Sequence, residues 1–164
     1  MKYVYYYISL LVLLCSATCR AQDTSLLMVH FGTTYDATRQ KTIDAINQKA
    51  RAAFPQYDFA EAYTSRIVMK RLAERGIKKQ SPLDAMLKLR GEGYRKLIIQ
   101  PSFIIDGKEM DMLRHDVEKM RPFFDEIRIG TPLLYTVGDA EHVCDILVKR
   151  HAADAKKREH VVFV

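Results

Sequence analysis

Short apolar runs alternate along the chain with longer segments in which apolar residues recur at helical spacing. Such runs are typical of buried strands, and they lie at 25–31, 57–63, 96–100, 126–129 and 161–164. The helical spacing occurs at 36–54, 65–74, 82 to 91 or 93, 108–121 and 139–151. Because the two kinds of segment alternate throughout, the pattern predicts one α/β domain with a parallel sheet flanked by helices on both faces.

The helices carry further signals. Ser81, Pro82 and Asp84 form a strong helix start, because serine caps the first turn, proline suits the first helical position and an acid favours the helix N-terminus. The apolar side chains of each helix are expected to point inward. Among them are Ile43, Ile46, Ile67, Val68, Leu72, Val143, Ile146 and Leu147.

The first residues have the organisation of a secretory signal. Lys2 precedes an apolar run at 3–14, and small residues lead to Cys19 and Ala21. We expect residues 1–21 to be a signal peptide cleaved after Ala21, which leaves a mature domain at 22–164 in the periplasm or otherwise exported. Lipoprotein anchoring through Cys19 or Cys15 and an uncleaved anchor are the alternatives.

Composition narrows the class of protein. Hydrophobic residues make up 48% and charged residues 28%, which fits a globular protein. The net charge is +6, and without Lys2 and Arg20 it is +4, too diffuse to predict nucleic acid as a partner. Cys144 is the lone cysteine outside the leader, on an apolar helical face, where packing is a more common role than chemistry.

Ligands of open α/β sheets lie beyond the carboxyl ends of the strands. This rule selects the loops 30–35, 63–66, 101–109 and 131–138. They hold the groups that a polar ligand could use: His30, Thr33, Thr34, Tyr35, Thr64, Ser65, Arg66, Asp106 and Glu109.

Two of these loops suggest specific chemistry. Gly32 permits a tight turn, and Thr33 and Thr34 could either receive an anion or cap the helix that follows. No Gly-Lys-Ser/Thr follows, so a nucleotide is not expected. In the third loop, apolar residues around Phe103 could form one wall of a flat pocket, and Glu109 could serve the site or stabilise its helix.

Seven segments, in order, resemble the anaerobic sirohydrochlorin cobaltochelatases of the CbiK type: 28–35, 62–68, 81–85, 93–94, 104–109, 121–124 and 130–134. The resemblance implies a chelatase-like fold of two similar α/β domains with a tetrapyrrole cleft between them. This chain would be the N-terminal domain, with the C-terminal domain absent. It also implies insertion of Co²⁺, with Ni²⁺ or Fe²⁺ as other metals that suit such ligands, into a tetrapyrrole such as sirohydrochlorin, without a nucleotide.

The resemblance also assigns roles to residues. Glu109 matches a metal-site acid, and His30, where relatives often carry serine, could replace a lost ligand or be a hydrogen-bonded structural residue. The family's catalytic histidines lie beyond Val164, and Phe103 stands where some relatives carry histidine. The expected substrate-binding residues are Gly32, Thr33, Thr34, Tyr35, Ser65, Arg66 and Phe103.

Three functions follow from the sequence. The first is an exported sirohydrochlorin cobaltochelatase of the cobalamin biosynthesis type, present as its N-terminal half. The second is a periplasmic tetrapyrrole or metal carrier without chelatase activity, and the third is an inactive truncated fragment. A homo-oligomer could rebuild a two-domain cleft from two copies.

Overall fold

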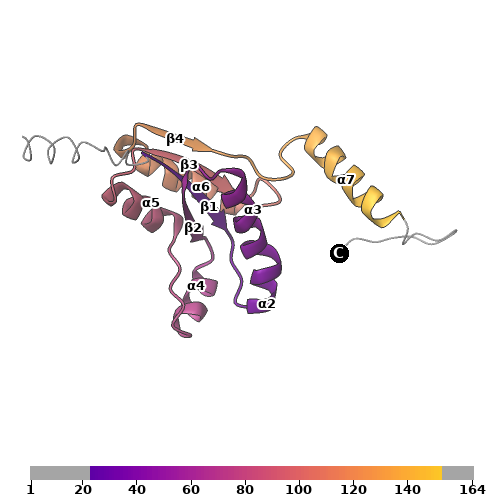
Figure 1. Cartoon of the computed structure of the whole chain (residues 1–164), viewed down its shortest axis with the longest axis horizontal. Coiled ribbons are helices and arrows are strands. Elements are labelled where there is room, and N and C mark those ends of the chain that lie inside the picture. The colour runs from indigo at the N-terminus through magenta and orange to yellow at the C-terminus, as the bar shows by residue number, and fades with distance from the viewer. Residues whose placement is uncertain (1–22, 153–164) are drawn as a thin grey trace, which may run out of the picture.

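The fold is built on a sheet of four parallel strands, seen in a computed structural model that describes residues 23–152 (Figure 1). The strands are β1 (Thr24–His30), β2 (Asp58–Tyr63), β3 (Lys96–Pro101) and β4 (Glu126–Ile129), in the order β2-β1-β3-β4. All four match apolar runs in the sequence. The predicted signal peptide and the predicted strand at 161–164 lie outside the described residues.

Helices connect the strands. They are α2 (Asp36–Arg39), the π-helix η1 (Gln40–Asp44), α3 (Ala45–Ala53), α4 (Arg66–Ala73), α5 (Pro82–Gly91), α6 (Lys108–Met120), the 3₁₀-helix η2 (Arg121–Phe123) and α7 (Val137–His151). The predicted helix at 36–54 corresponds to α2, η1 and α3 in succession. Ser81 caps α5 as expected, since its side chain accepts a hydrogen bond from the backbone N–H of Asp84.

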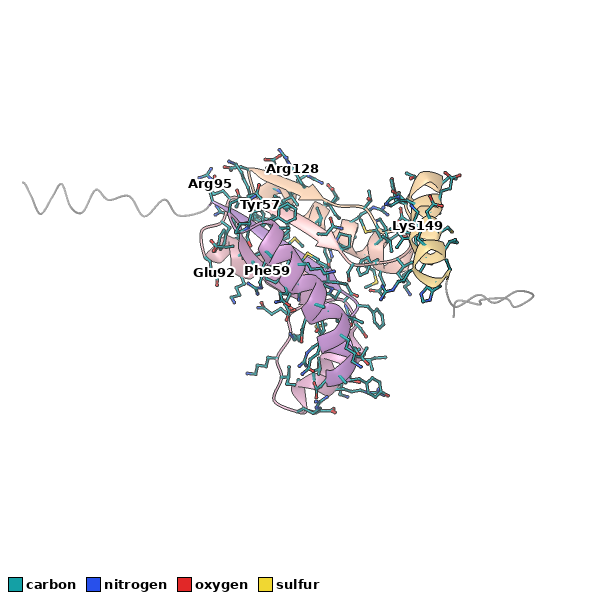
Figure 2. All side chains as sticks on the ribbon, turned by 45° about the vertical axis from the view of Figure 1, so that its right-hand side comes forward. Tyr57, Phe59, Glu92, Arg95, Arg128 and Lys149 are labelled. Carbon is teal, nitrogen blue, oxygen red and sulfur yellow. The ribbon has the colours of Figure 1, made fainter. Side chains whose placement is uncertain are left out.

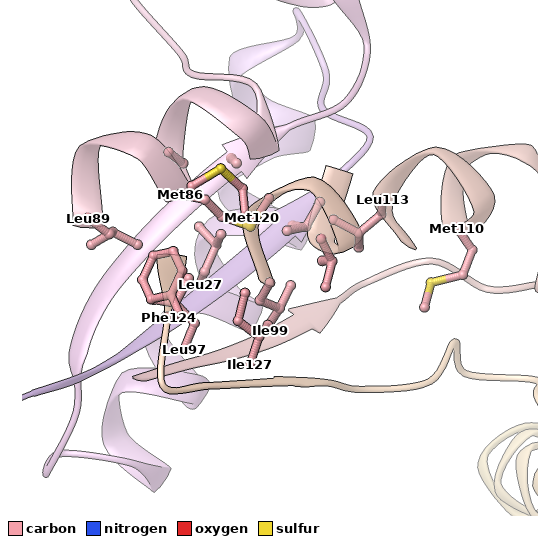
Figure 3. Close-up of a cluster of buried hydrophobic side chains, with 14 of the residues drawn as sticks. Leu27, Met86, Leu89, Leu97, Ile99, Met110, Leu113, Met120, Phe124 and Ile127 are labelled. Atoms are coloured by element: carbon pink, nitrogen blue, oxygen red, sulfur yellow. The ribbon is translucent and has the colours of Figure 1, made fainter. Parts of the chain in front are cut away.

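One face of the sheet packs against α5 and α6 to form the main core (Figure 3). Residues two apart along a strand point to the same face, as Leu97 and Ile99 do on β3. The core gathers Leu27, Leu97, Ile99 and Ile127 from the strands, Met86 and Leu89 from α5, and Leu113, Val117 and Met120 from α6.

The other face of the sheet lies against α3. The Arg51 guanidinium of α3 stacks 3.6 Å above the ring centroid of Phe59 on β2. Asn47 of α3 hydrogen-bonds to His30 of β1 and to Glu61 of β2. Helices therefore cover both faces, and the predicted α/β class with a parallel sheet is confirmed.

Two inward positions were predicted wrongly. Ile46 is exposed, and the inward position of α3 is taken by the polar Asn47, which is only 7% exposed. The next buried position after Ile43 is four residues on, at Asn47, rather than three residues on, at Ile46. This part of the helix directly follows the π-helical turn. Ile67 is 67% exposed, because α4 buries Leu72 and partly buries Val68 in a small cluster with Tyr63.

The last helix, α7, stands apart from the sheet (Figure 1). Figure 2 shows Lys149 of α7 on the opposite side of the molecule from Arg95. The helix begins with a capping box, in which Thr136 and Asp139 bond to each other's backbone N–H groups. No residue of α7 is buried, so the inward packing predicted for Ile146 and the packing role predicted for Cys144 are both wrong within residues 23–152.

A helix that crosses a bilayer must be long and apolar. None of the helices within residues 23–152 has both the length and the apolar character needed to cross a bilayer.

Candidate functional site

A cavity of about 540 Å³ opens where β1 and β3 end, at the edge of the sheet that the strand-end rule selected. Its volume lies in the usual range for sites that bind small molecules. Its lining comes from the loops after the two strands, from α2 and η1, and from the start of α6. The lining residues are His30, Phe31, Gly32, Thr33, Thr38, Thr42, Ile43, Ser102, Phe103, Ile104, Ile105, Gly107, Lys108 and Glu109.

Gly32 shapes the floor of the cavity. Its φ of 98° lies in the left-handed region, and a Cβ atom there would stand 2.5 Å from Cδ2 of the Tyr63 ring. Glycine therefore serves both the turn and the close approach of the loop to β2. Tyr63 is fully buried, its hydroxyl has no hydrogen-bond partner among the described residues, and burial raises its pKa to about 12.

Glu109 carries the strongest chemical signal in the cavity. It lies in the first turn of α6, where the helix dipole favours an acid. One carboxylate oxygen, Oε2, is buried and has no hydrogen-bond partner among the described residues. A buried carboxylate oxygen without a partner is costly, and a cation or a hydrogen-bond donor at this point would remove the cost. The dipole alone does not explain why Oε2 is buried without a partner.

His30 is the centre of a buried polar chain. Its Nδ1 lies 2.7 Å from Ser102 Oγ, and its Nε2 lies 2.9 Å from Asn47 Oδ1. The Asn47 amide in turn donates to Glu61 Oε2 at 2.8 Å. Lys79 forms an ion pair with the other oxygen of Glu61. This series of hydrogen bonds thus runs from Ser102, which lines the cavity, through His30 and Asn47 to the ion pair of Glu61 and Lys79. That ion pair lines a second hollow.

The environment of His30 favours the neutral form of its ring. The side chain is only 1% exposed, and burial lowers its pKa from 6.5, with the Asn47 hydrogen bond and the Glu61 charge opposing the shift. Because both ring nitrogens already have protein partners, a metal could bind only if His30 left one of these bonds. In this structure His30 is a hydrogen-bonded structural residue, and a role for it as a metal ligand stays a prediction.

The structure separates the predicted substrate-binding residues into two groups. Gly32, Thr33 and Phe103 line the cavity. Ser65 caps α4 through a bond from the Val68 N–H, and Arg66 lines a separate hollow with Met112 and Asp116.

Two residues of the first loop lie just outside the cavity. Tyr35 is exposed, and its backbone N–H donates to Thr33 Oγ1. The carbonyl of Thr34 accepts a hydrogen bond from Arg75. Thr33 therefore acts in this structure as a turn residue whose side chain also borders the cavity.

The remaining acid of the third loop is engaged elsewhere. Both carboxylate oxygens of Asp106 accept hydrogen bonds of 2.7 Å from Arg114, which hold the pKa of Asp106 below its ordinary value. Within residues 23–152, no three side chains of histidine, cysteine, aspartate or glutamate gather in a way that could hold a metal ion. Glu109 would have to share a metal with the bound ring or with ligands outside this range.

Sequence reasoning missed Asn47 and Ser102. Asn47 lies 17 residues from His30 and Ser102 lies 72 residues away. A polar residue at an inward helical position was the available signal for Asn47. Ser102 directly follows β3, in a loop that the strand-end rule had selected.

Comparisons with known proteins assign the chain to a family. The model of the family described as cobalt chelatase (CbiK) matches residues 24–164. A sirohydrochlorin cobaltochelatase of Salmonella typhimurium is 34% identical over 141 residues, which are 85% of this chain and 53% of that protein. The sirohydrochlorin cobaltochelatase CbiKC of Nitratidesulfovibrio vulgaris is 35% identical over 127 residues, or 76% of this chain and 45% of that protein.

A solved structure shares the fold. A cobalamin (vitamin B12) biosynthesis CbiX protein from Marinobacter aquaeolei superposes with a TM-score of 0.52 at 14% identity, over 80% of this chain and 99% of that chain. This likeness confirms a chelatase-like α/β domain. The chain spans about half the length of the curated relatives that it matches. Since the family model and both relatives agree over most of its length, the chain belongs to the CbiK family of cobalt chelatases.

Proposed function

We propose that this protein acts in the insertion of Co²⁺ into sirohydrochlorin, as the N-terminal half of a cobaltochelatase. The observation that carries the proposal is that Glu109, whose buried Oε2 has no partner among the described residues, lines a cavity whose other walls are largely apolar. An apolar wall suits the faces of a tetrapyrrole, and a carboxylate oxygen suits a divalent ion such as Co²⁺. The two relatives described above are sirohydrochlorin cobaltochelatases, which supports this substrate.

Each part of the cavity has a distinct task in this proposal. Phe103, Ile104 and Ile105 bind the ring by apolar contact and exclude water from its edge. Glu109 holds the incoming ion beside the ring, where its negative charge offsets the loss of hydration. Ni²⁺ and Fe²⁺ suit the same oxygen ligand, so metal choice is a separate measurement.

The test is an insertion assay with the purified protein, sirohydrochlorin and Co²⁺, followed by absorbance. We expect acceleration over the uncatalysed rate, and we expect Glu109→Gln to lower that rate by about 10–100-fold. Glu118→Gln is the matched control, because Glu118 lies on the same helix but is exposed and pairs with Arg121. Equal rates for the Glu109 and Glu118 variants, with a lower melting point for Glu109→Gln, would assign Glu109 to helix stability alone.

A carrier of tetrapyrrole or metal is the second candidate. Binding of a tetrapyrrole without insertion requires only the apolar walls of the cavity, which the described residues supply. The same assay separates the two functions, since a carrier binds sirohydrochlorin without accelerating insertion. An inactive fragment would neither bind the ring nor accelerate insertion.

We also propose export to the periplasm, on the pattern of the first 21 residues alone. Mass spectrometry of the protein recovered from the periplasm of a bacterial host should find Gln22 at the N-terminus. A diacylglycerol-modified Cys19 would replace soluble export with membrane anchoring. An intact N-terminus in the cytoplasmic fraction would overturn the proposal.

A further inference from the structure

The buried chain of polar residues behind the cavity fixes where its protons lie. Glu61 is paired with Lys79, so its carboxylate can only accept hydrogen bonds. The Asn47 group that faces Glu61 must therefore be the NH₂ group, and the Asn47 carbonyl oxygen must face His30. A carbonyl oxygen cannot donate, so His30 Nε2 has to carry the hydrogen.

The other ring nitrogen then determines the state of Ser102. With the imidazole neutral and its hydrogen on Nε2, Nδ1 has only a lone pair. The hydroxyl of Ser102, 2.7 Å away, must donate its hydrogen to Nδ1. A hydroxyl has one hydrogen, so Ser102 Oγ can offer only lone pairs to a ligand in the cavity that Ser102 lines.

We propose that His30 is a positioning residue, which holds the Ser102 hydroxyl as a pure hydrogen-bond acceptor for an N–H group of the cavity's ligand. The backbone N–H of Ser102 donates to the Val29 carbonyl at 2.9 Å, which fixes the residue against β1. Glu109, whose buried Oε2 has no donor among the described residues, also lines the cavity. A ligand that presents donors or positive charge therefore suits this lining.

The ligand assignment rests on the proposed function. A metal-free tetrapyrrole carries pyrrole N–H groups at its centre, whereas the cobalt complex of the same ring has lost them. Ser102 should therefore distinguish the substrate of the insertion reaction from its product. This is a role in recognition, and it needs no proton to leave His30.

The first experiment reads the tautomer without any ligand. Two-bond ¹H–¹⁵N spectra of the ¹⁵N-labelled protein show which nitrogen of each histidine ring bears hydrogen, and His30→Gln identifies the signals of His30. We expect hydrogen on Nε2 and none on Nδ1 at neutral pH. Hydrogen on Nδ1 would overturn the proposal, because Ser102 would then be free to donate into the cavity.

The second experiment measures binding of metal-free sirohydrochlorin and of its cobalt complex by absorbance titration. We expect Ser102→Ala to weaken binding of the metal-free ring by about three- to tenfold, the usual worth of one hydrogen bond, and to leave the cobalt complex unchanged. Ser102→Thr keeps the hydroxyl and should restore the preference. Equal losses for the two rings, or no loss for either, would overturn the proposal.

These results are distinguishable from failure of the proposed function. Wild-type protein that binds the ring without inserting cobalt would contradict the chelatase function, and the two titrations would still judge Ser102. Wild-type protein that does not bind the metal-free ring would remove the ligand assignment together with the proposed function. The tautomer would still be judged by the spectra of the ligand-free protein.

Discussion

Gly32, just after the end of β1, must satisfy two requirements, one of backbone conformation and one of space. The backbone has a φ of 98°, which strains any residue with a Cβ atom, and the space for that atom is occupied by the Tyr63 ring. We expect Gly32→Ala to lower the free energy of unfolding by about 2–5 kcal/mol, from backbone strain and overpacking together. Gly76→Ala is the control, since Gly76 has a φ of 78° but nothing within 4 Å of the added atom.

Urea unfolding of the two variants separates the contributions. Gly76→Ala should cost only the backbone strain, about 1–2 kcal/mol. If both variants lost the same stability, the contact between the Gly32 loop and the Tyr63 ring would contribute nothing.

The buried histidine makes stability depend on mildly acidic pH. Burial lowers the pKa of His30 in the folded protein below its ordinary value of 6.5. Below that pH the unfolded chain therefore binds more protons than the folded protein, and stability falls as pH falls, by up to about 1.4 kcal/mol per pH unit. The carboxyl groups of Asp106 and Asp125 have pKa values held below 3.8 by arginine partners, so they act only at lower pH.

Melting curves between about pH 7.5 and pH 5 test this dependence on His30. We expect the melting temperature of His30→Gln to fall less steeply across this range than that of the wild-type protein. His115→Gln replaces an exposed histidine and is the control variant. Parallel slopes for all three proteins would show that His30 is not the group that titrates.

At the scale of elements, two helix caps of the same chemistry should have different consequences. Ser81 caps α5, whose Pro82, Met86 and Leu89 are buried in the core. Thr136 caps α7, which buries no residue. We expect Ser81→Ala to lower the free energy of global unfolding by about 1 kcal/mol and Thr136→Ala to leave it unchanged within error.

Hydrogen exchange shows where the second cap acts. Thr136→Ala should speed exchange of the α7 amides, because losing the capping box promotes opening of a helix without tertiary support. Amides of β1 and β3 should keep their protection. A drop in global stability equal to that of Ser81→Ala would mean that α7 unfolds together with the sheet.

The elements themselves could largely be predicted from the sequence, because their signals are local. The run at 96–100 became β3, and the Ser81 signal began α5, each within two residues of its predicted start. The packing of α7 could not be predicted, because helical spacing of Val143, Ile146 and Leu147 indicates a stripe but not a surface to cover it. Strand order was not predicted either, since it depends on crossovers between distant segments.

The candidate site could also be predicted only in part from the sequence. Gly32, Phe103 and Glu109 could be predicted, because carboxyl ends of parallel strands meet at one edge of a sheet. The contacts among His30, Asn47 and Ser102 could not, since they require the register of β1 against β3 and the phase of α3 after a π-helical turn. Polar contacts across such sequence distances leave little trace in local patterns.

At the scale of the whole molecule, several large apolar side chains are exposed and do not belong to the core. Phe31, Ile104 and Ile105 line the cavity and are nevertheless mostly exposed. Under the proposed function, a flat tetrapyrrole in the cavity would cover these side chains. Exposed side chains contribute little to the stability of the fold. Substitutions of these three residues should therefore weaken ligand binding with little effect on stability.

Ile105→Ser tests this expectation, because Ile105 is 65% exposed in the structure. We expect binding of metal-free sirohydrochlorin to weaken by about 1–2 kcal/mol, from apolar area no longer buried by the ring, with a melting temperature within about 1–2 °C of the wild type. Leu87→Ser is the matched control, since Leu87 is 53% exposed on α5 and does not line the cavity. Its binding should equal that of the wild-type protein. Equal weakening in the two variants would mean that exposed apolar surface in general binds the ring, and the cavity would then lose its claim to be the site.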